Sequence, residues 1–294
     1  AAVGTVSGTS ISFGTPVVVY ASASGDSTGT TFDSNSNKIV INYKTGSGSG
    51  ESRVGTVSGT SISFGTAAAF EGGAISDIAA TFDSDSNKVV VAYQDTDNSS
   101  YGTAAVGTVS GTDISFGTPV VFSSEITNEV ITVFDSNANK IFIGYSDKSA
   151  GGAVGHGTGI VGTVSGTSIS FGTALVWAAA DTDFEFAAFD STAKKVAIAF
   201  RDRDNSSYGT GVVFDTGPVT TDVNDEIGIA AEAGTDGNPL DVTILGGVNA
   251  SQSGLTIAGE YWAADDGTLS SSDTGYQKMG VALSATELLI RGNS

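Results

Sequence analysis

The sequence predicts an all-β protein, and three observations support this. A phrase reading Val-Gly-Thr-Val-Ser-Gly-Thr-x-Ile-Ser-Phe-Gly-Thr begins at Val3 and returns at Val54, Val106 and Val161, so that successive starts differ by 51, 52 and 55 residues. A second phrase, Phe-Asp-Ser-x-x-x-Lys, follows every copy. Forty Gly and only four Pro among 294 residues are typical of short strands joined by tight turns. The chain is therefore expected to repeat one small β unit.

The residues after the second phrase alternate with a period of two, which predicts a strand. In the first copy Ile39, Ile41 and Tyr43 share one face, while Val40 and Asn42 share the other. The first of these faces is formed in the other copies by Val89, Val91 and Tyr93, by Ile141, Ile143 and Tyr145, and by Val196, Ile198 and Phe200. Large residues on one face and small or apolar residues on the other predict a strand that is covered on both sides.

Three further strands complete each repeat. One precedes the second phrase and ends in its Phe-Asp, one runs through Val-Gly-Thr-Val, and one runs from Ile-Ser-Phe-Gly-Thr to an aromatic residue. Glycines that suit the tight turn between the last two are Gly8, Gly59, Gly111 and Gly166. Four short antiparallel strands in roughly fifty residues are typical of a propeller blade. Residues 1–217 are therefore expected to form a β-propeller-like domain of four four-stranded repeats.

The chain enters this pattern on its last two strands and leaves it on its first two and a last stretch, Tyr208 to Phe214, that is like the third. Together they could complete a fourth blade and close a ring without a free strand edge. Two alternatives stay open: upstream blades that this sequence does not contain, or an open stack of sheets that forms a shaft.

The overall charge disfavours several kinds of partner. The 32 acidic and 12 basic residues give a net charge of −20, which repels phosphate backbones and anionic lipid. We therefore expect neither nucleic-acid nor membrane binding, and an excess of carboxylates suits a saline exterior. The absence of cysteine excludes disulfides, thiolate metal sites and thiol catalysis within this sequence.

Recognition is expected at the edge of the repeats where the loops vary. The loops after the strands at 88–94 and 195–201 share an Asp-x-Asp-Asn pattern, and each is followed by a tyrosine. The candidate ligand-binding residues are Asp95, Asp97, Asn98 and Tyr101 in one loop, and Asp202, Asp204, Asn205 and Tyr208 in the other. Loops on a rigid scaffold are frequent binding sites, and aromatic rings beside carboxylates suit a glycan. An equally plain interpretation is that the two tyrosines are core residues of their strands and that the loops vary because nothing constrains them.

Calcium is a candidate cofactor, on weak grounds. An acid precedes the first strand of each repeat, and these acids are Asp26, Asp77, Glu129 and Asp183. The Asp-x-Asp loops have the opening spacing of a calcium loop, but they lack its central glycine and its distal bidentate Glu. Turn formation by the Asp and Asn side chains explains these patterns better than a metal does.

No catalytic residue is assigned. The one histidine of the chain, His156, lies in a glycine-rich stretch that is expected to be a mobile loop, and no Ser-His-Asp or metal-ligand set can be built around it. Paired carboxylates are plentiful, but the pattern does not single out a glycosidase pair. We therefore expect a protein that is not an enzyme.

From residue 218 the repeat stops and a second composition begins. Short strands separated by turn signals are expected at 227–231, 240–245, 259–263, 278–283 and 287–290. Residues 218–294 are therefore expected to form a small β-barrel or β-sandwich module. Because so few residues build a poor core, this module is expected to pack on the repeats or on copies of itself.

The module contains an ordered series of short motifs. They are Gly254-Leu255-Thr256, Gly259-Glu260-Tyr261-Trp262, Asp266-Gly267-Thr268-Leu269-Ser270 and the run from Lys278 to Ile290. This series resembles the small β-module near the ends of bacteriophage virion proteins, including tail-fibre and capsid-decoration proteins. Tyr261-Trp262 departs from the pair of tyrosines that is frequent there. The repeats also resemble those of fibre-like proteins from marine phages.

The resemblance implies a non-enzymatic virion component, either a fibre or a decoration protein. Its localisation would be the virion or the extracellular space, and its partners would be other virion proteins or copies of itself in a homo-oligomer. The variable loops would then contact a glycan on the host surface. The alternative is a secreted carbohydrate-binding lectin or adhesin of the β-propeller type, with loops supported by calcium.

Overall fold

The computed structural model describes residues 1–21, 28–150, 155–216, 229–230, 242–243, 248–249, 254–263, 269–271 and 277–290. The chain divides into two compact units, Ala1–Thr216 and Gly217–Ser294. The described part is all-β, apart from one three-residue 3₁₀ turn, η1 (Lys148–Ala150). No helix among the described residues is long and apolar enough to cross a membrane.

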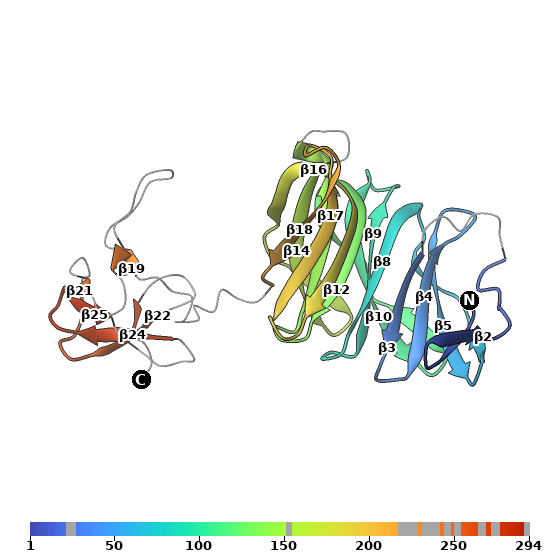
Figure 1. Ribbon diagram of the computed structural model, residues 1–294, viewed down its shortest axis with the longest axis horizontal. Coiled ribbons are helices and arrows are strands. Elements are labelled where there is room, and N and C mark those ends of the chain that lie inside the picture. Colours follow the sequence, from blue (N-terminus) through green and yellow to red (C-terminus); the bar gives the residue numbers. More distant parts are fainter. Residues whose placement is uncertain are drawn as a thin grey trace. The chain divides into compact units, whose positions relative to one another are not determined.

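The first unit consists of a hairpin and four sheet sections, which follow one another in chain order (Figure 1). The hairpin is β1 (Gly4–Ser7) and β2 (Ser10–Phe13). Section 1 contains β3 (Thr28–Asp33), β4 (Lys38–Lys44), β5 (Gly50–Ser58), β6 (Ser61–Phe64) and β7 (Ala68–Glu71). Section 2 contains β8 (Ile75–Asp83), β9 (Lys88–Asp95), β10 (Tyr101–Ser110), β11 (Asp113–Phe116) and the first half of β12 (Val120–Asp135).

Sections 3 and 4 continue the same pattern. Section 3 contains the second half of β12, β13 (Lys140–Asp147), β14 (His156–Ser165), β15 (Ser168–Phe171) and the first half of β16 (Leu175–Asp190). Section 4 contains the second half of β16, β17 (Lys195–Asp202) and β18 (Tyr208–Phe214). All pairings are antiparallel, and β8 to β18 belong to one continuous sheet that curls into a half-barrel.

The long strands β12 and β16 correct one expectation. The last strand of a repeat and the first strand of the next were expected as separate elements. β7 and β8 are separate as expected, but β12 and β16 each join such a pair in one strand of sixteen residues. The first half of β12 pairs with β10 and its second half with β13, and the halves of β16 pair in the same way with β14 and β17. Before β12 the break lies earlier instead, at Gly117, which follows the short strand β11 and lies against the turn of the next hairpin.

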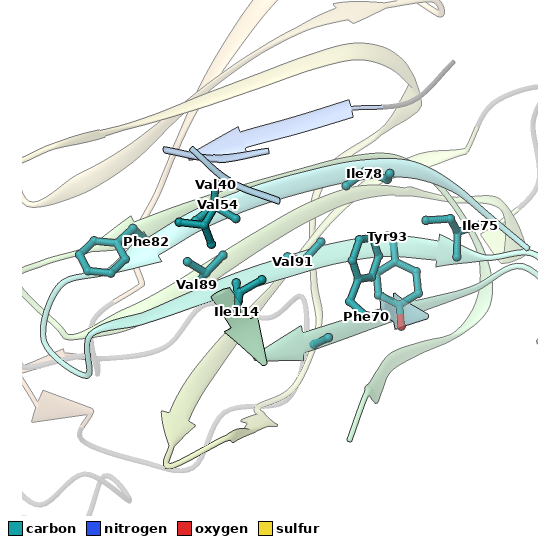
Figure 2. Close-up of a cluster of buried hydrophobic side chains, with 11 residues drawn as sticks. Val40, Val54, Phe70, Ile75, Ile78, Phe82, Val89, Val91, Tyr93 and Ile114 are labelled. Atoms are coloured by element: carbon teal, nitrogen blue, oxygen red, sulfur yellow. The ribbon is translucent and has the colours of Figure 1, made fainter. Parts of the chain in front are cut away.

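The core lies between the sections. We call the face that each section turns toward the next one its forward face, and the opposite face its rear face. Val40 and Val54 on the forward face of section 1 share a cluster with Val89 and Val91 on the rear face of section 2 (Figure 2). The next two interfaces join Val90 and Val106 to Ile141 and Ile143, and Phe142 and Val161 to Val196 and Ile198. As expected, β9 and β13 are buried on both faces, whereas β17, for which the same was expected, alternates between buried and exposed residues.

The ends of the array are not joined in the described structure. β1 pairs with β2, and β18 pairs with β17 alone among the described strands. The expected fourth blade, completed by both ends, is therefore not formed. Phe214 supplies a physical reason. Its buried ring packs against Phe142 in a tilted arrangement with a centroid distance of 4.8 Å and fills the place that a hairpin side chain takes at the earlier interfaces.

In the second unit the described strands are short. They are β19 (Ile229–Ala230), β20 (Val242–Thr243), β21 (Val248–Asn249), β22 (Glu260–Ala263), β23 (Leu269–Ser270), β24 (Gln277–Ala282) and β25 (Leu288–Ile290). Five of them form one sheet in the order β21-β25-β24-β22-β23. A small core joins Leu255, Tyr261, Ala282 and Leu288. Each expected strand of this unit contains a described strand.

Candidate functional site

In both Asp-x-Asp-Asn loops the first carboxylate holds the turn. Asp95 Oδ1 accepts the N–H of Asn98 at 3.1 Å. Asp202 Oδ1 accepts the N–H groups of Asp204 at 3.1 Å and of Asn205 at 3.0 Å. Asx turns of this kind explain why the pattern needs Asp at its first position.

The second carboxylate of each loop reaches a different segment. Asp97 Oδ2 accepts the N–H of Ala74 at 2.8 Å, and Asp204 Oδ2 accepts the N–H of Asp181 at 3.1 Å. Ala74 and Asp181 lie beside the bulged segments at the starts of the first strands. These acids therefore fix the loop to its own section, and the interpretation as structural turn residues accounts for them.

The two candidate tyrosines differ in their surroundings. Tyr101 begins β10 and is paired on both sides, with Asp95 of β9 and with Ile126 of β12. Tyr208 begins β18, is paired with Asp202, and is 62% exposed. Of the eight predicted ligand residues, Tyr208 therefore offers the most accessible aromatic surface.

The acids that precede the first strands lie in a different place. Asp77 and Glu129 line a cavity of about 300 Å³ together with Thr28 and Glu185. These residues belong to β3, β8, β12 and β16, whose neighbours in this order contact one another. Asp183, by contrast, is not among the residues that line this cavity, and Asp26 lies outside the described residues.

β-bulges turn these side chains into the cavity. The ladder between β8 and β9 is interrupted after Ser76, and Asp77 there has a φ of 49°. The ladder between β12 and β13 is interrupted in the same way, and Glu129 has a φ of 52°. A bulge re-aims a side chain, and positive φ is uncommon for residues other than glycine. A β-bulge at the same repeat position in both sections explains why Asp77 and Glu129 line the same cavity.

Glu185 is a site residue that the sequence interpretation missed. It stands four residues before Phe189, where the second and third copies have the buried Ile78 and Val130 and the first copy has the exposed Thr28. An acid at a position that is apolar in two of the three other copies is a signal that the repeat alignment could have given. Glu185 is only 4% exposed.

The environment of Glu185 favours its protonated form. Thr182 Oγ1 donates to its Oε1 at 2.7 Å, and Ser146 Oγ lies 2.9 Å from the same oxygen. Its Oε2 is buried and has no hydrogen-bond partner among the described residues. Burial raises the pKa of Glu185 to about 7, although the hydrogen bonds from Thr182 and Ser146 lower it, and the charges of Glu129 and Asp183 act in the same direction as burial.

Asp77 and Asp183 are shifted in opposite directions. Burial raises the pKa of Asp77. Hydrogen bonds from Arg201 and Arg203 lower the pKa of Asp183, with Arg201 making the larger contribution. Asp183, which was a candidate metal ligand, thus forms salt bridges with Arg201 and Arg203.

Further polar contacts near the cavity come from one repeat position, which lies directly before each variable loop. Gln94, Ser146 and Arg201 each stand twelve residues after the phenylalanine of the second phrase. Gln94 Nε2 donates to Asn128 Oδ1 at 3.0 Å, Ser146 reaches Glu185, and Arg201 reaches Asp183. The sequence interpretation missed all three, although different polar residues at one position of a strand that otherwise keeps its alternation could have been noticed.

His156 lies in a strand and not in the mobile loop that was expected. It begins β14 and pairs with Asp147 of β13 and with Asp181 of β16. A register shift between His156 and Gly157 opens the ladder at this point. The glycines of this stretch accommodate large neighbours, because a Cβ on Gly157 would lie 2.4 Å from the Trp177 ring.

The melting temperature is expected to be the same in millimolar calcium and in chelator. Among the described residues, no group of three or more His, Cys, Asp and Glu side chains could hold a metal ion. The loop carboxylates of Asp97 and Asp204 already accept backbone N–H groups. Differential scanning fluorimetry would test this, and a calcium-dependent rise that disappears in Asp204→Asn would contradict it.

Comparison of the chain with protein-family models finds no match, and comparison with curated proteins finds none either.

Proposed function

We propose that this protein is a non-enzymatic structural component of a virion appendage, either a fibre or a decoration protein, whose repeats are blade-like units. The observation that carries the proposal is a set of hydrogen bonds in which the variable loops after β4, β9 and β13 hold the next section. The N–H groups of Ile75, Thr127 and Thr182 each donate to a carbonyl of the preceding section, namely Gly48, Ser100 and Gly155. The same bond at every junction ties the sections into one array.

Close packing at the opposite edge supports the same role. A Cβ on Gly65 would lie 1.9 Å from the carbonyl oxygen of Thr112, and one on Gly117 would lie 1.9 Å from that of Thr167. Each hairpin turn thus sits directly on the backbone of the section before it. Repeats that contact only their neighbours build extended, quasi-one-dimensional structures, which suits an appendage.

The order of motifs in residues 254–290 supports the virion assignment. Leu255 and Tyr261 from the first two motifs, and Leu288 from the last, lie in the core of the second unit. The residues that carry the resemblance to phage β-modules therefore include core residues of this unit. We propose that this unit mediates attachment or assembly.

Immunogold labelling of virions concentrated from the source would test the assignment. Labelling along fibres or over the capsid is expected. Label confined to cell surfaces or to secreted material would contradict the proposal and favour the alternative, a secreted lectin or adhesin.

We further propose that host glycans are contacted at the loop of section 4, through Tyr208. Its exposed ring stands beside the turn that Asp202 holds, and aromatic rings are frequent anchors at binding surfaces.

Tyr208→Ala is expected to weaken binding to host cells or arrayed glycans by about tenfold or more. Tyr101→Ala is the matched control, because it removes the same side chain from the same loop pattern in section 2, where the ring is half-buried. Equal binding by Tyr208→Ala and the unaltered protein, with both shown to be folded by circular dichroism, would rule out this contact.

A further inference from the structure

Section 4 ends in a sheet face unlike those of the earlier sections. Residues of β17 alternate between buried and exposed, whereas β9 and β13 are buried on both faces. Ala197 is exposed, although it takes the position that buried Val90 holds in section 2. Phe186 is 72% exposed and Val213 is 64% exposed. We call this forward face, formed by Phe186, Ala197, Ala199 and Val213, the tail face.

A second apolar surface lies on the β1–β2 hairpin. Val6, Ile11 and Phe13 are all exposed there, Ile11 at 56% and Phe13 at 68%. They stand on one face, because Val6 is paired directly with Ile11 and Phe13 is paired with Gly4 in the same ladder. We call these three residues the head surface.

Surfaces of these two kinds meet inside the molecule. Ile114, which corresponds to Ile11 in the third hairpin, is buried and shares a cluster with Val40 and Val54 on the forward face of section 1 (Figure 2). Ile169 does the same in the next interface, with Val90 and Val106 of section 2. A hairpin isoleucine therefore packs over the forward-face valines of the preceding section.

The strand register shows that Val213 takes the position in section 4 that Val54, Val106 and Val161 take in sections 1 to 3. Val213 pairs with Ala197 in the same way as Val54 pairs with Val40 and Val106 pairs with Val90. The tail face thus presents the surface that a hairpin covers in two earlier interfaces, and the head surface presents the side chains that would cover it.

We propose that the tail face of one molecule binds the head surface of a second copy of the chain. The contact reproduces the hairpin part of the interfaces that already join sections 1 and 2, and sections 2 and 3. It is heterologous, so that repetition gives either a filament or a closed ring of molecules. This inference goes beyond the proposed function and does not depend on where the protein acts.

The rear face of section 4 needs no such partner. Phe214 is buried against Phe142 and completes the interface between sections 3 and 4, where the repeat has no hairpin of its own. An incoming hairpin therefore has its matching surface on the forward face. Head and tail lie at opposite ends of four sections that contact one another in order, which favours a second molecule over the hairpin of the same chain.

Charge sets the conditions for the contact. The net charge of −20 opposes self-association, whereas the residues of both surfaces are uncharged. Salt screens the repulsion, with a Debye length of about 8 Å at physiological ionic strength. Assembly is therefore expected to strengthen as salt is raised.

Sedimentation velocity of the full chain over a range of protein and salt concentrations tests the proposal. The unaltered chain is expected to form a concentration-dependent series of oligomers. Val213→Asp on the tail face and Ile11→Asp on the head surface are each expected to raise the dissociation constant by about 30-fold or more. Leu175→Asp, which places the same charge at an exposed leucine outside both surfaces, is expected to leave assembly unchanged.

Mixing the two blocked variants gives the decisive measurement. Val213→Asp retains its head and Ile11→Asp retains its tail, so an equimolar mixture is expected to form dimers that do not grow further. This rescue also shows that both variants are folded. A monomeric unaltered chain under all conditions, unimpaired assembly of either variant, or a mixture that stays monomeric would each overturn the proposal. None of these results would bear on the location of the protein in a virion.

Discussion

Replacing Glu185 with Gln is expected to raise the free energy of unfolding at pH 8 by about 3 kcal/mol, because it removes a carboxylate that the fold holds in an unfavourable place. The ordinary pKa of this side chain is 4.5, and burial raises it to about 7. The difference of roughly 2.5 units, at 1.36 kcal/mol per unit, gives this magnitude. Within the described part of the chain, the Oε2 atom has no hydrogen-bond partner to offset the loss of water.

The sign of the pH dependence follows from the direction of the shift. Between pH 4.5 and 7 the folded protein binds a proton at Glu185 that the unfolded chain has already released. Stability contributed by this group is therefore present below pH 4.5 and is lost as the pH rises to about 7. Glu185→Gln should remove that loss.

Urea unfolding at pH 5 and pH 8 measures both effects. Glu125→Gln is the control, because Glu125 lies exposed on β12 and its substitution removes one negative charge without altering the cavity. A Glu185→Gln protein that loses as much stability between pH 5 and pH 8 as the Glu125→Gln control would contradict the assignment.

Substitution of Gly117 by Ala is expected to destabilise the repeat unit by about 3 kcal/mol, a large cost for a single methyl group. Its Cβ would lie 1.9 Å from the carbonyl oxygen of Thr167, and the obstructing atom is backbone that cannot rotate away. The turn of the fourth hairpin would have to separate from section 2. The cost comes from the close approach of two segments, since the φ of Gly117 is not in the left-handed region.

Gly172 provides a matched control within the same phrase. It stands at the same place in the fourth copy of Phe-Gly-Thr, but the nearest atom to its Cβ is 3.8 Å away, because no further hairpin follows. Gly172→Ala is therefore expected to change the free energy of unfolding by less than about 1 kcal/mol. Thermal unfolding of both variants checks the pair, and equal effects would show that the hairpin contact does not hold the sections together.

Much of the local structure was accessible from the sequence. The alternation of Val89 and Val91 with Val90 predicted a strand buried on both faces, and β9 is such a strand. The Asp of the second phrase holds a tight turn, because Asp83 Oδ1 accepts the N–H groups of Asp85 and Ser86. Both features depend on residues close together in the chain, where periodicity and turn chemistry act directly.

The candidate site was accessible only in part. Asp77 and Glu129 were named as acids before a strand, and the structure places them in one cavity. Asp183 was named on the same grounds but pairs with Arg201 and Arg203, and Glu185 was not named. The sequence pattern gives the position of an acid along its strand, but a bulge decides toward which side it points.

The sequence alone determined that this protein repeats one antiparallel β unit four times, because spacing and alternation are properties of the chain. The tertiary structure decided how the repeats meet: which face of each section points forward, that the expected fourth blade is not closed, and that Phe186 and Val213 remain exposed. The physical reason is that a two-residue period assigns the residues of a strand to two faces but does not determine what packs against either face. Burial is fixed only when another section covers a face, and the forward face of section 4 is the one that no following section of the repeat array covers.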